Sequence, residues 1–278
     1  MKTLICALFV FGMVCVATRS SWGQDPTELA LQPPPIISPP GEKYASCDRP
    51  FQGIPGIERA ANGRLWATWY GGGPDEGPEN YVMLVTSGDD GKSWADVLFV
   101  IDPPGIVRAF DPCLWHDPQG RLWLFWAQGV THWDGRGGVW AIVTEQSGEA
   151  NPSWSAPRRL CDGIMMNKPT VLQDGTWLLP AAIWAMPSLN PADPKYVIDN
   201  TKTTGSWVVA STDQGKTFTP LGRSNVDGRQ CDEHMVVERN DGSLWMVVRT
   251  KYGLGESFST DGGKTWSEGR PAETVKHI

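Results

Sequence analysis

The octet Ser259-Thr260-Asp261-Gly262-Gly263-Lys264-Thr265-Trp266 has the form S-x-D-x-G-x-T-W. Two other stretches, Ser87–Trp94 and Ser211–Phe218, repeat its order of polar, glycine and aromatic positions. In such an octet the Asp side chain can accept hydrogen bonds from backbone N–H groups two residues on. The Gly can take a positive φ, and the last aromatic ring folds under the turn. Each octet therefore predicts a tight hairpin, and three copies indicate an internal repeat.

A second motif recurs between the octets: a polar residue and a Gly, followed by a short strand that carries Trp. Its four copies are Asn62–Trp66, Gln119–Trp123, Asp174–Trp177 and Asp241–Trp245. An octet follows each copy. The second octet, which we place at Ser147–Trp154, keeps the Ser and the Trp but lacks the Asp and the second Gly. The two motifs thus recur in phase over four repeats.

Four repeats of short strands predict an all-β fold, a β-propeller whose blades are four-stranded antiparallel sheets. In each blade we expect the polar-Gly turn to join the two inner strands and the octet to join the outer pair. Neighbouring blades must supply the core, because one blade cannot bury both of its faces. A β-sandwich, the alternative, does not account for two motifs in phase. Because propellers have ~4–8 blades, we expect an incomplete six-bladed ring with one or two further blades beyond these four.

The chain divides into three segments. Residues 1–24 have a basic start and an apolar run of about fifteen residues, which is typical of a secretory signal peptide. A membrane anchor is the alternative. Residues 25–48 form a Pro-rich, extended lead-in, and residues 49–278 form the propeller. No other segment approaches the ~18 apolar residues of a membrane span. We therefore expect a secreted or periplasmic protein that leaves the membrane after signal cleavage.

The composition narrows the classes of partner. The chain has a formal net charge of −7 and no basic cluster, which argues against binding nucleic acid or anionic membranes. Outside the signal, Cys47, Cys113, Cys161 and Cys231 could form disulfides in an exported protein or remain free thiols, and their spacing fits no zinc site. The chain has 15 Trp residues. We expect most of them to pack beneath turns or between sheets, and a few to offer stacking platforms for a sugar ring.

The octets resemble Asp-boxes, or BNR repeats, and the pattern over about residues 50–270 resembles the sialidase (neuraminidase) superfamily in its bacterial BNR-repeat-like branch. The resemblance implies a glycan substrate with a terminal sugar acid, whose carboxylate is held by three Arg side chains. It also implies a Tyr nucleophile, a Glu that accepts the Tyr proton and an Asp that protonates the leaving oxygen. It implies no metal and no cofactor. In this family the Asp-boxes lie at the blade periphery and are structural, so they identify a fold without locating its chemistry.

The stretch from Asp232 to Arg249 is similar to the family's segment in which a Glu precedes an apolar strand, a D-G turn and a second strand that ends in Arg. By this resemblance Glu233 is the base and Arg249 binds the substrate carboxylate. The proton donor of the family lies in a loop before the first Asp-box, which corresponds to Glu76, with Asp75 and Glu79 as alternatives in the same loop.

Two family positions differ in this sequence. The aromatic-Arg-Ile-Pro motif of the first blade reads Phe51-Gln52-Gly53-Ile54-Pro55, so Gln52 stands near the place of an Arg. The family's Tyr nucleophile and third Arg belong to later blades. Tyr252 follows Arg249 closely, but in the wrong blade for the nucleophile, and we interpret it as packing.

The starts of the other blades add polar residues at equivalent positions. Arg108 and Asp111 open the second blade, where Arg108 could supply the cation missing at Gln52, and Asn167 and Lys168 open the third. The predicted polar ring consists of Gln52, Arg108, Asp111, Asn167, Lys168, Asp232, Glu233 and Arg249. Of these, Glu233, Asp111 and the loop residue Glu76 are the catalytic candidates, and the others are candidates for substrate binding.

Such a ring suits an anionic sugar such as sialic acid or a uronate. The first functional hypothesis is a secreted, sialidase-like glycoside hydrolase that releases a terminal anionic sugar from a glycan. The second is a BNR propeller that binds a glycan without turnover. The third is a hydrolase or lyase for another acidic sugar on the same fold.

Overall fold

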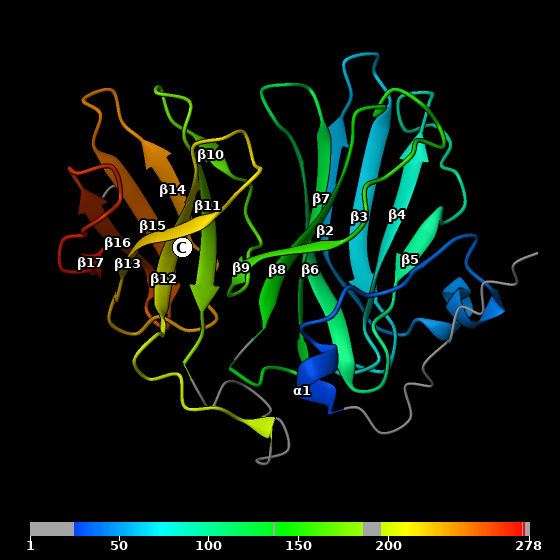
Figure 1. The fold of residues 1–278 in the computed structure, drawn as a ribbon, viewed down its shortest axis with the longest axis horizontal. Helices are drawn as coiled ribbons and strands as arrows, with labels where there is room; N and C mark the ends of the chain where they lie inside the picture. Colours follow the sequence, from blue (N-terminus) through cyan, green and yellow to red (C-terminus); the bar gives the residue numbers. More distant parts are fainter. Residues whose placement is uncertain (1–24, 136, 186–195, 274, 276–278) are drawn as a thin grey trace, which may run out of the picture.

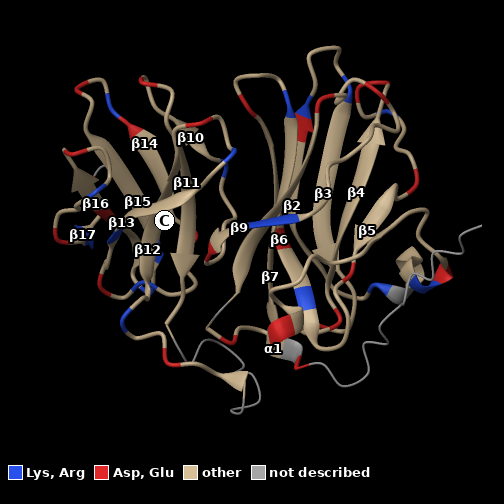
Figure 2. Cartoon of the chain, viewed as in Figure 1, with Lys and Arg blue, Asp and Glu red and all other residues tan. Residues whose placement is uncertain are grey.

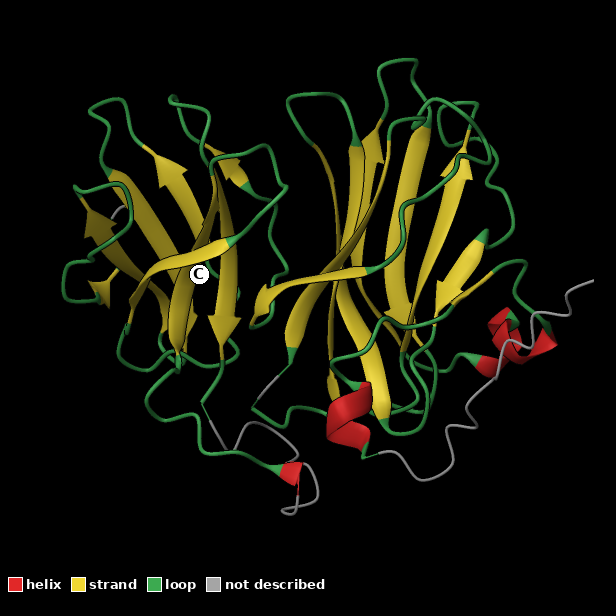
Figure 3. Ribbon diagram, viewed as in Figure 1, coloured by secondary structure: helices red, strands yellow, loops and turns green. Residues whose placement is uncertain are grey.

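The computed structural model describes residues 25–135, 137–185, 196–273 and 275. The signal segment expected at residues 1–24 lies outside the described residues. Strands dominate the described chain, and helices are confined to single turns (Figure 3). Among the described residues, no helix has the length and apolar character needed to cross a membrane.

The strands form four antiparallel sheets that follow one another across the molecule in chain order (Figure 1). The first sheet contains β2 (Gln52–Arg59), β3 (Leu65–Gly71), β4 (Tyr81–Ser87) and β5 (Phe99–Ile101). The second contains β6 (Val107–His116), β7 (Leu122–Val130), β8 (Gly138–Thr144) and β9 (Arg158–Asp162). The third contains β10 (Thr170–Val171), β11 (Trp177–Ile183), β12 (Gly205–Ser211) and β13 (Thr219–Ser224). The fourth contains β14 (Met235–Glu238), β15 (Leu244–Thr250), β16 (Gly253–Ser259) and β17 (Arg270–Pro271).

This arrangement confirms the predicted propeller blades and their turns. Within each sheet the four strands are hydrogen-bonded in sequence order. The polar-Gly turn joins the first two strands of every blade, and the octet or its equivalent joins the last two. Each blade is thus a meander, and the first strands of neighbouring blades lie near one another, as β2 and β6 do.

The lead-in differs from the extended segment that we predicted. It contains a one-turn helix α1 (Pro26–Leu29), a short strand β1 (Ile36–Ile37) and two 3₁₀ turns, Glu42–Tyr44 and Ser46–Asp48. β1 pairs with β5, so the first sheet has five strands. The prolines prevent a long helix, but they leave two consecutive isoleucines able to pair with the free edge of the sheet.

The core explains the unusual number of Trp residues. Eight of them are buried: Trp66, Trp115, Trp123, Trp126, Trp133, Trp140, Trp177 and Trp184. The main apolar cluster fills the space between the first and second sheets and extends to the start of the third. The prediction that most Trp residues pack in the core is therefore confirmed. The four described cysteines are free thiols. Of the two alternatives, disulfides or free thiols, the structure therefore has the second.

The octet Ser259–Trp266 is held by hydrogen bonds within its own eight residues. Ser259 Oγ accepts the N–H of Gly263 at 2.9 Å and donates to Asp261 Oδ1 at 2.8 Å. Asp261 accepts the N–H of Thr265 at 2.9 Å and its hydroxyl at 2.6 Å. Asp261 also accepts the N–H of Lys264 at 3.0 Å, so its N–H donors are three and four residues on, not two as we expected. These hydrogen bonds, first of all the one from the Thr265 hydroxyl, lower the pKa of Asp261 below its usual range.

The second octet begins earlier than the sequence indicated. Thr144 pairs with Leu122 of β7, at the position where the other blades have the first residue of the octet. Three extra residues therefore precede Ser147, and the connection is a longer loop. It still ends at Trp154, whose ring packs edge-on against Trp66 at 6.0 Å between centroids. The aromatic ring at this position therefore packs between the two blades.

The third octet packs through its glycine against Trp177 of its own blade and Trp123 of the second blade. Gly215 has φ +80°, and a Cβ at this position would lie 2.5 Å from the Trp177 ring and 3.0 Å from the Trp123 ring. Arg121 and Arg158 of the second blade donate to backbone carbonyls of the same octet. The glycine is therefore required both by its backbone conformation and by the close approach of two buried rings.

We expect Gly215→Ala to destabilise the fold more than Gly242→Ala. Both glycines have φ +80°, so each substitution costs about 1–2 kcal/mol of backbone strain. A Cβ at Gly242 meets nothing within 4 Å, whereas at Gly215 it overlaps two buried rings. Overpacking should add about 1–3 kcal/mol at Gly215 alone. Denaturant unfolding of the two variants measures the difference, and equal destabilisation would show that Gly215 is not packed closely against these two rings.

Candidate active site

A bulge places one carboxylate inside the second blade. The first strands β2 and β6 each contain a register shift, at Ile54-Pro55 and Asp111-Pro112. Ile54 and Asp111 have φ values of 48° and 49°, in a region that side chains other than glycine seldom adopt. The bulge redirects the side chain at this position. In the first blade it redirects an aliphatic side chain, and in the second it turns Asp111 toward the charged groups described next.

The environment of Asp111 favours its protonated form. The residue is 3% exposed, and burial raises the pKa of its carboxyl to about 7, against the opposing effect of the nearby Arg108 guanidinium. The charges of Glu76 and Glu233 raise it further. Asp111 therefore holds a proton up to about neutral pH, which is the property required of a general acid.

The loop at residues 71–80 turns one of its three carboxylates inward. The Tyr70 hydroxyl, which is completely buried, donates a hydrogen bond to Glu76 Oε1. Asn80 braces the loop by donating to the carbonyls of Gly72 at 2.7 Å and Asp75 at 3.1 Å. The side chains of Asp75 and Glu79 are exposed. Of the three alternatives, the structure therefore places Glu76 beside Asp111.

Glu233 and Arg249 lie together, as the sequence pattern indicated. Glu233 lies two residues before β14 and Arg249 lies near the end of β15, and Arg249 Nη1 donates to Glu233 Oε1 at 2.5 Å. Their side chains are 34% and 55% exposed, so both can meet a solute. Because Glu233 affects the pKa of Asp111, this pair and Asp111 share one region of the molecule. Their catalytic roles stay predictions.

Arg108 does not occupy the place of the cation that is missing at Gln52. The register of the two first strands makes Ala109, which pairs with Gln128, equivalent to Gln52, which pairs with Gly71. Arg108 precedes Ala109 by one residue, so strand alternation turns its side chain to the opposite face of the sheet. It is 1% exposed, and its guanidinium carbon lies 3.7 Å from the centroid of the Phe110 ring. It donates to His132 O at 2.9 Å and to Asn80 Oδ1 at 3.1 Å. The buried Arg108 therefore lowers the pKa of Asp111 by its charge, and it has no exposed surface with which to bind a substrate.

Two further candidates support the backbone around Glu233. Asn167 Nδ2 donates to the carbonyls of Glu233 at 2.9 Å and His234 at 3.1 Å. Asp232 is buried and accepts hydrogen bonds from Ser206 Oγ at 2.6 Å and Arg229 Nη1 at 2.9 Å. These contacts hold the segment that presents Glu233. They make Asn167 and Asp232 positioning residues in this structure.

The last two candidates lie apart from the carboxyl cluster. Gln52 is exposed and accepts the indole N–H of Trp69 at 2.8 Å. Lys168 pairs with Glu58, whose other oxygen lies 2.9 Å from His116 Nδ1. Burial alone would raise the pKa of Glu58, but hydrogen bonds from His116 and Lys168 lower it. This charged group links the first three blades, and Lys168 is committed to it.

The resulting cluster consists of Glu76, Asp111, Glu233 and Arg249, which come from three blades. Sequence reasoning missed three residues that organise it, namely Tyr70, Asn80 and Arg229. The signal for Asn80 was its place at the end of a Gly- and Pro-rich loop, directly before a buried strand. Among the described residues, no group of His, Cys, Asp and Glu side chains has the arrangement of a metal site.

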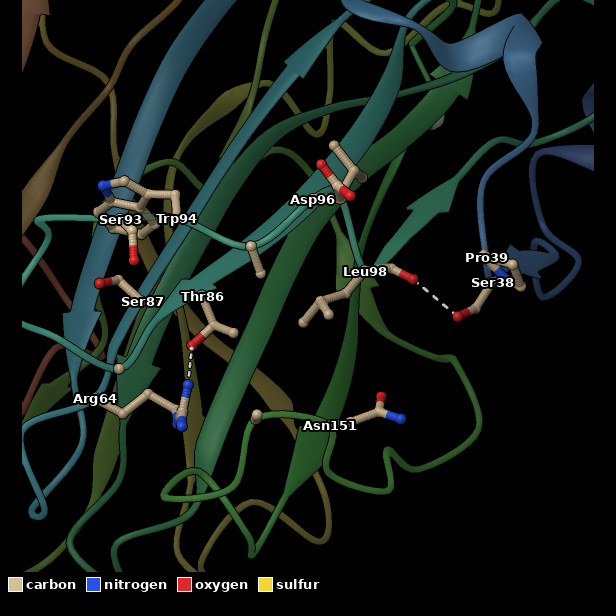
Figure 4. A pocket seen from close by; sticks show the side chains of 14 residues that line it. Ser38, Pro39, Arg64, Thr86, Ser87, Ser93, Trp94, Asp96, Leu98 and Asn151 are labelled. Carbon is tan, nitrogen blue, oxygen red and sulfur yellow. Dashed lines mark hydrogen bonds between the residues drawn. The ribbon is translucent and has the colours of Figure 1, made fainter.

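A separate surface pocket of about 810 Å³ lies beside the first octet (Figure 4). Ser93, Trp94, Arg64 and Asn151 are among the residues that line it. None of the predicted catalytic or substrate-binding residues lies in this pocket. The carboxyl cluster and the pocket are therefore different features of the surface.

Comparisons with known proteins are consistent with this architecture. A family model described as a BNR repeat-like domain matches residues 63–276. No curated protein matches the chain. A Hadza microbial sialidase has a TM-score of 0.56 at 18% identity, over 78% of this chain and 46% of its own. A Dyadobacter fermentans protein of unknown function has a TM-score of 0.60 at 17% identity, over 86% of this chain and 72% of its own.

Trypanosoma rangeli sialidase, solved in complex with the inhibitor DANA, has a TM-score of 0.57 at 21% identity, over 78% of this chain and 37% of its own. This chain thus spans less than half the length of either of these two sialidases. At such identities the likeness concerns the fold, which is that of a sialidase-like β-propeller.

Proposed function

Because this chain belongs to the BNR repeat-like domain family of the sialidase superfamily, we propose that it takes part in glycoside hydrolysis at a terminal acidic sugar of a glycan. The observation that carries this proposal is the convergence of Glu76, Asp111 and Glu233 from three blades, with the pKa of Asp111 raised to about 7. Hydrolysis of a glycosidic bond needs one carboxyl group that holds its proton and one carboxylate that accepts a proton. In this cluster Asp111 is the group that holds a proton, and Glu233 is the candidate that accepts one.

In this proposal the residues have separate roles. Asp111 donates a proton to the leaving oxygen, because burial keeps it protonated. Glu233 accepts a proton, and it forms an ion pair with the adjacent Arg249 guanidinium. Arg249 also attracts the substrate carboxylate, since a guanidinium remains charged and can fork onto two oxygens. Glu76, held by Tyr70, sets the charge around Asp111. By the family resemblance, the Tyr nucleophile is supplied from a later blade.

Export is part of the same proposal, since an extracellular or periplasmic protein meets glycans and the first 24 residues have the pattern of a signal peptide. A specific observation favours a second candidate, a propeller that binds a glycan without turnover. Arg249 is paired with Glu233 and Arg108 is buried, so neither cation is free in the described structure. Binding alone would need fewer free cations than transition-state stabilisation does.

The test is an assay of the full-length gene product with sialosides and uronides that carry a fluorescent leaving group. We expect release from a sialoside. Release from the uronide alone would assign the chain to another acidic sugar. Saturable binding of a sialylated glycan without release of its sugar would favour the binding module and would refute hydrolysis.

A further inference from the structure

Charged residues lie mostly in the loops and turns of the protein, and few lie within the sheets (Figure 2). The strand β6 is an exception, because it contains both Arg108 and Asp111, and both residues are buried. The charge of Glu76, which belongs to the loop at residues 71–80 of the first blade, raises the pKa of Asp111. The position of this loop relative to β6 therefore determines how strongly Glu76 acts on Asp111.

Asn80 ends that loop, directly before β4, and is fully buried. Its amide oxygen accepts the N–H of Gly77 at 2.8 Å and a hydrogen bond from Arg108 Nη1 at 3.1 Å. Its amide nitrogen donates to the carbonyls of Gly72 at 2.7 Å and Asp75 at 3.1 Å. The amide therefore makes four hydrogen bonds, the full number that its two donors and two lone pairs allow.

Two of these hydrogen bonds hold the chain on both sides of Glu76. Asp75 precedes Glu76 and Gly77 follows it, and each is bound to the amide of Asn80 through its backbone. A further bond, from the Asn80 N–H to the carbonyl of Gly77 at 3.1 Å, closes the same turn. The carboxylate of Glu76 is held separately, by the hydroxyl of the buried Tyr70. Asn80 thus fixes the backbone around Glu76, and Tyr70 fixes its side chain.

Asn80 also binds the strand that carries Asp111. Its carbonyl accepts the N–H of Ala109 at 3.2 Å, and its amide oxygen binds the Arg108 guanidinium. Arg108 is itself held in place, because it also donates to the carbonyl of His132 at 2.9 Å. One buried residue therefore joins the loop of the first blade to β6 of the second blade, close to Asp111.

The chemistry of these contacts requires an asparagine. The amide oxygen faces two donors, the Gly77 N–H and the Arg108 guanidinium, and the amide nitrogen faces two carbonyls. An aspartate would place a carboxylate against both carbonyls, and a leucine of similar size would leave all four partners without their hydrogen bond. The four partners therefore select an amide and fix its orientation.

We propose that Asn80 is a positioning residue of the carboxyl cluster, which keeps Glu76 beside Asp111 by tying the loop of the first blade to β6. Its effect on turnover rests on the proposed function, whereas its effect on the arrangement of the two carboxyl groups does not. Without Asn80 the loop would lose its contacts on both sides of Glu76. The carboxylate of Glu76 would then be free to turn toward solvent, where its charge is screened and acts weakly on Asp111.

A double-mutant cycle followed by NMR tests this proposal on the full-length protein without any substrate. The titration midpoint of Asp111 is read from its carboxyl carbon resonance, which is assigned by its absence from Asp111→Asn. Because the charge of Glu76 raises the pKa of Asp111, Glu76→Gln should lower the midpoint in the wild-type background. In the Asn80→Ala background the same substitution should lower the midpoint by less than half as much.

Asn200→Ala is the matched control, because Asn200 is 3% exposed and its amide also binds a backbone carbonyl, that of Trp184 at 2.7 Å. This control should lower stability and leave the effect of Glu76→Gln at its wild-type size. Asn80→Ser is the milder variant, since its single hydroxyl donor cannot serve two carbonyls. It should reduce the effect of Glu76→Gln in the same direction, and circular dichroism checks that every variant is folded.

An equal effect of Glu76→Gln in the wild-type and Asn80→Ala backgrounds would overturn the proposal and leave Asn80 as a stabilising residue only. A reduced effect without hydrolysis of any acidic glycoside would support the positioning role and refute the proposed function. Hydrolysis together with an equal effect would do the reverse. In a protein that hydrolyses, Asn80→Ala should also move the alkaline limb of the pH–rate profile to lower pH, because Asp111 then loses its proton more readily.

Discussion

Asp111→Asn should make the protein more stable at pH 8 and lower the hydrolytic turnover that we propose. The pKa of Asp111 is raised from 3.8 to about 7 in the folded protein. Between these values the folded state keeps a proton that the unfolded chain releases, so stability falls as pH rises through this window. Above pH 7 the buried charge lowers stability by a free energy on the order of 4 kcal/mol. Asparagine has nearly the same shape and cannot ionise, so the variant should lack this loss.

Denaturant unfolding of both proteins between pH 4 and pH 8 measures the effect. The stability difference between variant and wild type should grow across this range and become constant above pH 7. Asp261→Asn is the control of opposite sign, because the pKa of Asp261 is lowered. That variant should be less stable than wild type at pH 7, and the difference should shrink in acid. Identical pH dependence of the Asp111 variant and wild type would show that Asp111 is not a buried, protonated acid.

The same substitution should lower turnover by about 10²–10⁴-fold, the usual contribution of a general acid. Higher stability together with lower activity would separate a catalytic role from a structural one, since loss of a structural contact lowers stability. It would also show that Asp111 lowers the stability of the fold and serves the reaction instead. The assay uses the substrate that the wild-type protein is found to hydrolyse.

Glu233→Gln should lower kcat by about 10²-fold or more with little change in stability. Glutamine keeps the size of the side chain but cannot accept a proton from the nucleophile. Because the pair with Arg249 is half exposed, its loss should change the free energy of unfolding by only about 0–1 kcal/mol.

Glu238→Gln is the matched control for Glu233. Glu238 ends β14, the strand that follows Glu233, and its carboxylate accepts the N–H of Gln173 at 2.7 Å. It is not among the charges that shift the pKa of Asp111. The control should leave turnover near that of the wild type. If Glu233→Gln turns over substrate at the wild-type rate, the assignment of the base is wrong and the family resemblance at this stretch does not extend to function.

The sequence alone was sufficient to predict the blades, because the interactions that define their turns are local. The Ser, Asp, Gly and Thr of each octet satisfy one another within eight residues, so their order can be recognised without any partner. The polar-Gly turns depend on a positive φ at a single residue. Glu233 and Arg249 were placed together because strand alternation and one hairpin determine their relation. Degenerate local signals were less reliable, as the second octet and the short strand in the lead-in show.

The tertiary structure decided the chemistry, because it depends on neighbours that are distant in the chain. Arg108 looked like a substrate ligand, but the strand register gives the position equivalent to Gln52 to Ala109, and Arg108 is buried against the Phe110 ring. The raised pKa of Asp111 results from burial and from carboxylates contributed by the first and fourth blades. The octets identified the repeat, but their docking on the preceding blade through Arg158 and Gly222 became visible only in three dimensions. A turn is encoded within its own residues, whereas burial, charge coupling and docking require the packed blades.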